Sequence, residues 1–396
     1  MNTQQFIKQF AGADVHSLAL KAGKYPDVDM SFALNQISGR QAALKKLPAW
    51  AATEGVIYPP HISMEQCSSE STAIYKRNIL NRLLGSKYSI TDLTGGFGVD
   101  FMYMSEGCSR AVYVERNDVL CETARQNALV FGRNNVEIVN SDAEKYLVSM
   151  PSTDVIYIDP ARRDATGGRT YAISDCTPDV IQLLPQLLNN AKYVVIKLSP
   201  MLDHNKTVED LNRVCRCVSE VHIVSVSNEC KELLLVLTKN YVGDYKMFCV
   251  NDKDVFSYTV SSSRTIPIYI NDETFDEMYL YEPNSSIMKA GCFSNISDTY
   301  GMPLIACNSN LFVSRGKEPD FPGRAFRVIR TTTMNKKELS RALSGIKKAN
   351  ITVRNFPMTV ALLRKRLKLS DGGDVYIFAT TTTHGTHVLL ICEKVY

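Results

Sequence analysis

The sequence predicts an α/β protein. Its central part is a doubly wound sheet of seven strands, preceded by a helical N-terminal region and followed by an α+β module. Apolar segments of strand length alternate with helix-length segments over residues 86–241, most strands are continuously apolar, and only five residues separate the last two. The predicted strands are Ser89–Leu93, Ala111–Glu115, Val136–Val139, Asp154–Asp159, Tyr193–Lys197, Glu220–Ser227 and Leu233–Thr238.

The flanking regions differ in composition from this central part. Stretches rich in Ala, Leu and Lys before residue 85 favour helices. Ser63 and Gln66 have capping-box spacing, which predicts one helix running from there through Leu84 until Gly85 ends it. After residue 245 short strands and turns predominate, and a basic helix at 335–348 leads into a sheet that we expect to be antiparallel. The predicted parts are a helical region at 1–85, an α/β domain at 86–241, a small α+β domain at 245–325 and a basic domain at 326–396.

The composition restricts the class of protein. Hydrophobic residues make up 45% of the 396 residues and charged residues 22%, as in globular proteins. No apolar run is long enough to span a membrane and the first residues lack the features of a signal peptide, so we expect no membrane partner and a cytoplasmic location. The 11 cysteines are scattered, so we expect neither a disulfide framework nor a metal site.

Positive charge is concentrated in one segment. The chain carries only +4, yet residues 315–368 contain fifteen Lys or Arg and three Asp or Glu, which is +12 and leaves −8 for the rest. Aromatic residues alternate with arginines in this segment, a pattern suited to stacking on bases and contacting phosphates. A solvated basic surface that balances an acidic body is the alternative. The cations predicted to contact RNA are Arg324, Arg327, Arg354, Arg364, Lys365 and Arg366.

A glycine-rich turn follows the first predicted strand and indicates a cofactor site. Its spacing matches neither the dinucleotide nor the triphosphate fingerprint. Glu115 ends the second strand, where it can accept hydrogen bonds from both ribose hydroxyls, and Asp142 follows the third, where it can accept from an adenine amino group. The predicted cofactor residues are Asp92, Thr94, Gly95, Gly96, Gly98, Glu115, Asp142 and Ala143. Two alternatives remain open: the three acids could be helix N-caps, and a dinucleotide dehydrogenase shares the ribose acid.

The predicted catalytic residues are Asp159, Pro160 and Lys197, at the ends of the fourth and fifth strands. Asp159 can accept a hydrogen bond from a substrate N–H and so direct the nitrogen lone pair, which is catalysis by positioning. Lys197 could be a base, a charge partner of Asp159 or only a lysine extending from a strand end. Arg162 and Arg163 could clamp a phosphate of the substrate or form a solvated edge.

These residues resemble the motifs of a known family. The segment Asp92–Asp100, Glu115, Asp142 and Asp159-Pro160 are similar to the cofactor and catalytic motifs of class I methyltransferases, which implies S-adenosylmethionine as cofactor. The resemblance extends to a bacterial group of methyltransferases with a ferredoxin-like insert and a C-terminal THUMP-like domain. THUMP domains occur in tRNA-modifying enzymes, which implies structured RNA, and tRNA in particular, as partner. The segments that carry this narrower resemblance are Glu65–Glu70, Asp159–Arg163, Tyr281–Ser286, Phe321–Arg324, Val353–Pro357 and Leu367–Thr380.

Two departures from related motifs restrict the chemistry. Ala161 and Arg162 stand where amino-group methyltransferases carry a second proline and an aromatic residue, so that aromatic cannot stack on a target base. Enzymes that form 5-methyluridine, whose Asp-Pro-Ala-Arg motif is similar, need a cysteine where this chain has Ser199-Pro200. We therefore expect methyl transfer to a nitrogen or oxygen of structured RNA. Two alternatives are a methyltransferase of a small molecule or protein, and an RNA-binding protein whose methyltransferase fold no longer catalyses.

Overall fold

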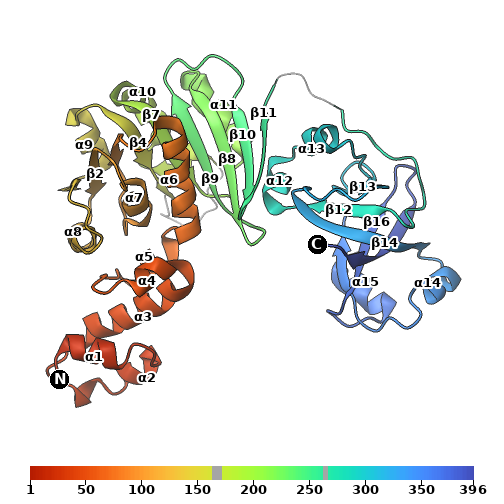
Figure 1. Cartoon of the computed structure of the whole chain (residues 1–396), viewed down its shortest axis with the longest axis horizontal. Helices are drawn as coiled ribbons and strands as arrows, with labels where there is room; N and C mark the ends of the chain where they lie inside the picture. The colour runs from red at the N-terminus through yellow and green to blue at the C-terminus, as the bar shows by residue number, and fades with distance from the viewer. Residues whose placement is uncertain (163–171, 262–265) are drawn as a thin grey trace. The chain divides into compact units, whose positions relative to one another are not determined.

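The computed structural model describes residues 1–162, 172–261 and 266–396 (Figure 1). Two compact units make up this part of the chain. The first comprises Met1–His222 and Lys231–Tyr245, and the second comprises Ile223–Cys230 and Lys246–Tyr396. The finer division into four parts stays a prediction.

The first unit begins with helices, as predicted. They are α1 (Thr3–Gln9), α2 (Val15–Ala19), the 3-10 helix η1 (Ala22–Lys24), α3 (Met30–Lys46), α4 (Pro48–Ala52), α5 (His61–Gln66) and α6 (Glu70–Leu84). Even the longest described helix, α3, has 17 residues, and no described helix meets the length and apolarity needed to cross a bilayer.

The single helix predicted from Ser63 to Leu84 is wrong. Two helices occupy this segment, because Cys67 adopts an extended conformation between α5 and α6. Ser69, and not Ser63, caps α6 by accepting a hydrogen bond from the Thr72 N–H at 3.3 Å. A tertiary contact accompanies the break: the neighbouring Ser68 hydroxyl donates to the Asp100 carboxylate at 2.7 Å. Gly85 ends α6 as predicted, with φ at +76°.

The sheet confirms the predicted fold class. Within it, seven strands follow the order β3-β2-β1-β4-β7-β9-β8, and β10 and β11 continue beyond β8. The strands from β3 to β7 pair in parallel and β9 pairs antiparallel with β7. The seven strands are β1 (Ser89–Asp92), β2 (Arg110–Glu115), β3 (Val136–Asn140), β4 (Thr153–Ile158), β7 (Ala191–Leu198), β8 (Val218–Val226) and β9 (Glu229–Thr238).

Helices connect the parallel strands, and this connection brings the carboxyl ends of β1, β2 and β4 to one edge of the sheet. That edge is where open α/β sheets bind ligands. The connecting helices are α7 (Val99–Met104), α8 (Asp118–Val130), α9 (Ala143–Ser149), α10 (Val180–Asn190) and α11 (His204–Val214). Between β4 and α10 lie β5 (Ala161–Arg162), the 3-10 helix η2 (Ile173–Asp175) and β6 (Cys176–Thr177).

A buried carboxylate joins α6 to the sheet. Arg82 donates to both oxygens of Glu220, with Nη1 at 2.8 Å from Oε1 and Nη2 at 2.5 Å from Oε2, and Nε2 of His222 lies 3.0 Å from Oε2. Burial raises the pKa of Glu220, but the hydrogen bonds from His222 and Arg82 lower it further, to about 2.

This arrangement predicts acid-sensitive stability. The pKa of Glu220 is about 2 in the folded protein and 4.5 as its ordinary value. Its stabilisation is therefore complete above that ordinary pKa and is lost as the pH falls towards 2. We expect the free energy of unfolding of Glu220→Gln to be about 2 kcal/mol lower than that of the wild type at pH 7. This difference should shrink as the pH falls below about 4. Denaturant unfolding at pH 7, 4 and 3 measures this difference; a gap that does not depend on pH would contradict the prediction.

The second unit contains a six-stranded sheet in the order β13-β12-β14-β17-β16-β15. The two faces of this sheet are both covered: Phe378 and Leu390 enter one apolar cluster, whereas Ile377 and Leu389 enter the other. The elements of this unit are β10 (Lys246–Asn251), β11 (Asp254–Thr259), β12 (Tyr279–Pro283), α12 (Ser285–Ala290), α13 (Phe293–Tyr300), β13 (Phe312–Ser314), β14 (Gly323–Thr333), α14 (Lys336–Ala342), β15 (Asn350–Val353), α15 (Val360–Leu367), β16 (Val375–Thr381) and β17 (His387–Lys394).

Two details of the second unit differ from the prediction. The sheet is mixed and not antiparallel, because α15 connects β15 to β16 as a crossover and the two strands run parallel. The basic helix expected at 335–348 ends at Ala342. Gly345 then adopts φ of +82°, and the carbonyl of Lys347 accepts from the Ser370 N–H at 3.0 Å, so this backbone pairs with the segment after α15.

Candidate active site

The glycine turn between β1 and α7 has a backbone that other residues adopt poorly. Gly96 and Gly98 have φ of +56° and +85°, in the left-handed region that favours glycine. Gly95 has no space for a side chain, because an added Cβ would lie 2.1 Å from the ring of Tyr113. The Tyr113 hydroxyl donates to the Gly96 carbonyl at 2.5 Å, and this bond fixes the turn against β2.

Replacing Gly95 tests this packing. We expect Gly95→Ala to destabilise the protein by roughly 1–3 kcal/mol, because the new methyl group must displace a buried ring. Denaturant unfolding measures the change. Gly12→Ala is the matched control, since a Cβ at Gly12 meets no atom within 4 Å. Equal stabilities of the two variants would show that the turn can move away from Tyr113.

Glu115 lies directly beside the turn. Its carboxylate accepts from the backbone N–H of Gly96 at 3.0 Å and from that of Asn117 at 2.9 Å. The N–H of Ser141 donates to the Glu115 carbonyl at 3.1 Å, so the end of β3 is held next to the end of β2. Asp142 then precedes α9, and its carboxylate pairs with Lys145 at 3.0 Å.

The helix-cap interpretation of the three acids finds little support. Gly98 occupies the N-cap position of α7 and Asn117 that of α8, so Asp92 and Glu115 are not caps. Asp142 does occupy the N-cap position of α9, yet its side chain accepts no hydrogen bond from that helix backbone. The three carboxylates are therefore not required to cap these helices.

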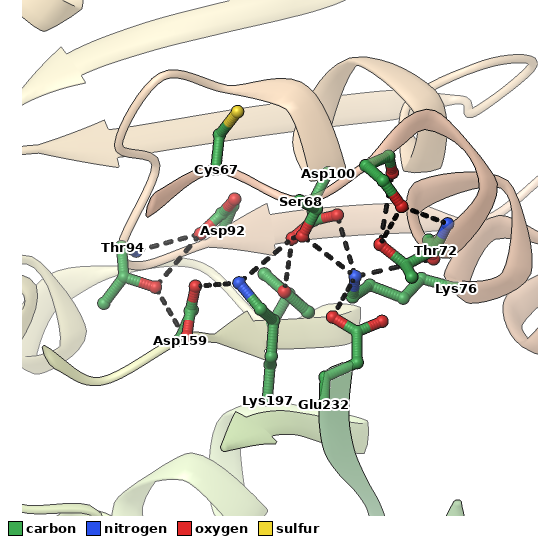
Figure 2. Close-up of polar contacts among 12 residues, drawn as sticks. Cys67, Ser68, Thr72, Lys76, Asp92, Thr94, Asp100, Asp159, Lys197 and Glu232 are labelled. Atoms are coloured by element: carbon green, nitrogen blue, oxygen red, sulfur yellow. Dashed lines mark hydrogen bonds and ion pairs between the residues drawn. The ribbon is translucent and has the colours of Figure 1, made fainter. Parts of the chain in front are cut away.

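Thr94 connects the glycine turn to the end of β4. Its hydroxyl accepts from the Asp159 N–H at 2.6 Å and lies 3.5 Å from the Asp92 carboxylate, to which it donates. Asp92 is 1% exposed, and burial raises its pKa well above the ordinary value. One side chain thus joins the predicted cofactor turn to the predicted reaction site (Figure 2).

Asp159 pairs with Lys197, whose ammonium group binds carboxylate oxygen Oδ2. In the described part of the chain no hydrogen bond reaches the other oxygen, Oδ1, and the side chain is 36% exposed. Burial lowers the pKa of Lys197, but the charges of Asp159, Asp100 and Glu232 raise it further, to well above its ordinary value. Lys197 therefore forms an ion pair with Asp159, and its role in the reaction stays a prediction.

Behind Lys197 lies a buried ionic network that sequence reasoning missed. Nζ of Lys76, on α6, lies 2.9 Å from Oδ1 of Asp100 and 2.7 Å from Oε2 of Glu232 (Figure 2). Oδ2 of Asp100 accepts from the Tyr157 hydroxyl at 2.8 Å and lies 3.7 Å from Nζ of Lys197. Lys76 is a charged residue in an amphipathic helix, a position that is usually exposed, so the sequence did not indicate its burial. The only signal near the predicted site was the acidic residue Asp100, two residues after Gly98.

The remaining predicted residues of this edge are placed only in part. Pro160 is buried directly after Asp159, and the backbone of Arg162 pairs with that of Cys176. Arg163 lies outside the described residues. No group of three or more His, Cys, Asp or Glu side chains in the described ranges is arranged to hold a metal ion.

The predicted RNA contacts lie in the second unit, and most of them already have carboxylate partners. Glu282 is buried and binds both Arg324 and Arg354. Arg327 pairs with Glu277, and Arg364 with Asp371 at 2.6 Å. Lys365 and Arg366 are exposed on α15 and form no ion pair within the described ranges. Further cations of this kind, which the sequence prediction did not single out, are Arg330, Lys336, Lys337, Arg341, Lys347, Lys348 and Lys368.

Comparison with known proteins supports the second unit's domain type. Residues 279–322 match the model of a ferredoxin-like domain, and residues 323–394 match that of a THUMP domain-like family. None of the curated proteins matches the chain.

A solved structure matches almost the whole chain. It is the crystal structure of a "putative methyltransferase" from Porphyromonas gingivalis W83, with 30% identity and a TM-score of 0.85, over 99% of this chain and 97% of that one. A "putative" class I S-adenosylmethionine-dependent methyltransferase from Listeria monocytogenes matches at 12% identity and a TM-score of 0.39, over 61% and 88%. The tRNA m1G37 methyltransferase of M. jannaschii matches with 12% identity and a TM-score of 0.32, over 44% of this chain and 52% of that one. Scores as low as these last two carry no functional information.

The strand order and the glycine turn define a class I methyltransferase fold. The chain belongs to the same family as the Porphyromonas protein: class I S-adenosylmethionine-dependent methyltransferases with a ferredoxin-like domain and a C-terminal THUMP-like domain.

Proposed function

We propose that this protein transfers the methyl group of S-adenosylmethionine to a nitrogen or oxygen atom of structured RNA, with tRNA as the candidate. The observation that carries the proposal is the Thr94 hydroxyl, which connects the glycine turn to Asp159. The glycine turn proposed to bind the cofactor and Asp159, proposed to orient the acceptor, are therefore connected through one side chain. A methyl donor held by the turn would then be near the Asp159 carboxylate, which can orient the acceptor.

The residues at the carboxyl ends of β1 to β3 fit this cofactor. Added Cβ atoms at Gly96 and Gly98 meet only one atom each within 4 Å, so the glycines leave space above the turn. The partly exposed Glu115 carboxylate offers acceptors for ribose hydroxyls. S-adenosylmethionine supplies an electrophilic methyl group on sulfur. The residues proposed to hold it are Asp92, Thr94, Gly95, Gly96, Gly98, Glu115, Asp142 and Ala143.

Asp159 is proposed to orient the acceptor through Oδ1, because Oδ2 is occupied by Lys197. An N–H or O–H of the substrate donates to Oδ1, and the acceptor lone pair is thereby directed to the methyl group. Lys197 holds this carboxylate in place through their ion pair, and buried Pro160 restricts the backbone that follows. Arg162 and Arg163 remain candidates for phosphate contacts.

The RNA partner is supported by charge and by domain type. From residue 323 onward the basic segment lies within the region that matches the THUMP domain-like family, a kind of domain found in tRNA-modifying enzymes. Arg324, Arg327, Arg354, Arg364, Lys365 and Arg366 are proposed as contacts. Because four of the six have carboxylate partners, the more accessible charge comes from Lys365, Arg366 and those lysines of the same segment that pair with no described residue.

The same ion pairs are the observation that favours a second candidate, a methyltransferase of a small molecule or protein. Paired arginines form a structural surface that needs no polyanion. Salt dependence separates the two candidates. If six to eight cations contact phosphates, the affinity for tRNA falls by several hundredfold or more between 50 and 200 mM salt. An affinity that barely changes favours the second candidate.

The cofactor is tested first, by calorimetric titration with S-adenosylmethionine. We expect micromolar binding to the wild type and a loss of at least tenfold in Glu115→Ala, because that variant lacks the carboxylate at the end of β2. Glu137→Ala is the matched control, since Glu137 lies on the adjacent strand β3 and pairs with Arg110 on the surface. Absence of binding to the wild type would refute the enzyme and favour a non-catalytic RNA-binding protein.

A further inference from the structure

The ionic network next to Asp159 contains more carboxyl groups than ammonium groups. Asp100, Asp159 and Glu232 face only Lys76 and Lys197. No arginine or further lysine of the described residues pairs with any of these three acids. If all five groups are ionised, one negative charge has no counter-charge among the described residues.

Glu232 is the carboxyl group that provides this excess. It is 3% exposed, and only one of its oxygens is occupied, by Lys76. The other oxygen, Oε1, is buried without a hydrogen-bond partner. A buried carboxylate oxygen without a donor is costly, and among the described residues no donor other than Lys76 offsets a charge on Glu232. The other two carboxylates, Asp100 and Asp159, both lie near the ammonium group of Lys197.

The excess charge is close enough to the exposed edge of the site to act on a ligand. The network runs without interruption from Glu232 through Lys76, Asp100 and Lys197 to Asp159, whose side chain is 36% exposed. Lys76 is fully buried, so solvent screens these charges little. At an effective dielectric constant of about 20, a unit charge at about 10 Å changes the affinity for a cation by roughly tenfold.

S-adenosylmethionine and its product differ in charge. The methyl donor carries a sulfonium cation, and S-adenosylhomocysteine, which remains after methyl transfer, carries a neutral thioether at the same position. We propose that the uncompensated carboxylate charge centred on Glu232 makes the site prefer the sulfonium cofactor over its thioether product. The preference would release the product and admit a new cofactor molecule. This inference rests on the proposed function, because it requires that the cofactor binds.

The test is the ratio of two dissociation constants, for S-adenosylhomocysteine and for S-adenosylmethionine, measured by calorimetry at pH 7.5. In Glu232→Gln the acids and ammonium groups are equal in number, and we expect the ratio to fall about tenfold. In the double variant Lys76→Met/Glu232→Gln the excess carboxylate returns, and the ratio should recover. Glu220→Gln is the matched control: it removes a buried carboxylate of β8 that pairs with Arg82 outside the network, and it should leave the ratio unchanged.

A second measurement needs no variant. Burial raises the pKa of Glu232, against the charge of Lys76, and the negative charge of Asp100 raises it as well, while Lys197 lowers it. Of the groups around it, Tyr157 on β4 also senses its charge. A raised carboxyl pKa means that the group gains its proton as the pH falls, so the wild-type ratio should decline between pH 7.5 and 4.5.

The outcomes separate the two proposals. If neither ligand binds to the wild type, the cofactor site itself is refuted, and this inference with it. If both bind and the ratio is the same in Glu232→Gln and constant with pH, the methyltransferase proposal stands and the charge preference is refuted. A change in Glu220→Gln equal to that in Glu232→Gln would also overturn it, because the effect would then not belong to the network.

Discussion

Lys76→Met is expected to destabilise the first unit by about 3–5 kcal/mol, the largest stability change we predict. Nζ of Lys76 binds the carboxylates of Asp100 and Glu232 as well as the Ser68 hydroxyl at 3.1 Å. Methionine fills a similar volume, but it leaves the buried Glu232 carboxylate without its ammonium partner and Asp100 with only the Lys197 ammonium at 3.7 Å. Denaturant unfolding with linear extrapolation measures the loss.

A double variant separates charge from packing. Lys76→Met/Glu232→Gln removes one positive and one negative group, so only Asp100 loses a partner, and Asp100 still lies 3.7 Å from the Lys197 ammonium. We expect this variant to be clearly more stable than Lys76→Met alone, because removing a whole buried pair costs much less than removing half of it. Equal stabilities would show that Lys76 acts through its packing and not through its charge.

The fold could be predicted because its signal is local. The seven predicted strands are mostly apolar runs, and most of the connecting segments have helical length, so pattern alone located β1 to β4 and β7 to β9 to within a few residues. The short strands β5 and β6 were not predicted. The residues that meet at the strand ends could also be predicted from the sequence. In doubly wound sheets, residues that follow successive strands meet at one edge, so their positions along the chain were enough to place Asp92, Glu115 and Asp159 together.

The errors and omissions have a different origin, because they depend on contacts between distant segments. The break between α5 and α6 accompanies the contact of Ser68 with Asp100, 32 residues away. Likewise, Glu232 meets Lys76 only because β9 and α6 meet in the fold. The basic segment shows the same limit. Its charge was obvious from composition, yet Glu282, which neutralises Arg324 and Arg354, precedes them by 42 and 72 residues.

Replacing Asp159 with asparagine is expected to reduce the turnover number of methyl transfer by 100- to 1,000-fold, the largest effect on activity that we predict. Asparagine keeps the size of the side chain but loses the charge that holds Lys197. Its amide also presents either a donor or a weaker acceptor to the substrate. The buried ammonium of Lys197 would then turn to Asp100, its remaining neighbour, and the acceptor group would lose its fixed partner.

Single-turnover methylation of RNA from a deletion strain measures this loss, with S-adenosylmethionine binding measured in parallel. The affinity for RNA should change by less than about threefold, because Asp159 is proposed to act on the acceptor. The affinity for S-adenosylmethionine should fall by no more than about tenfold, the effect expected from the loss of one carboxylate charge. Asp154→Asn is the matched control: Asp154 lies at the opposite end of β4, where its carboxylate accepts from the Ser89 N–H at 2.8 Å. A variant that methylates RNA at the wild-type rate would remove Asp159 from the reaction, and a loss confined to cofactor affinity would reassign it to the cofactor site.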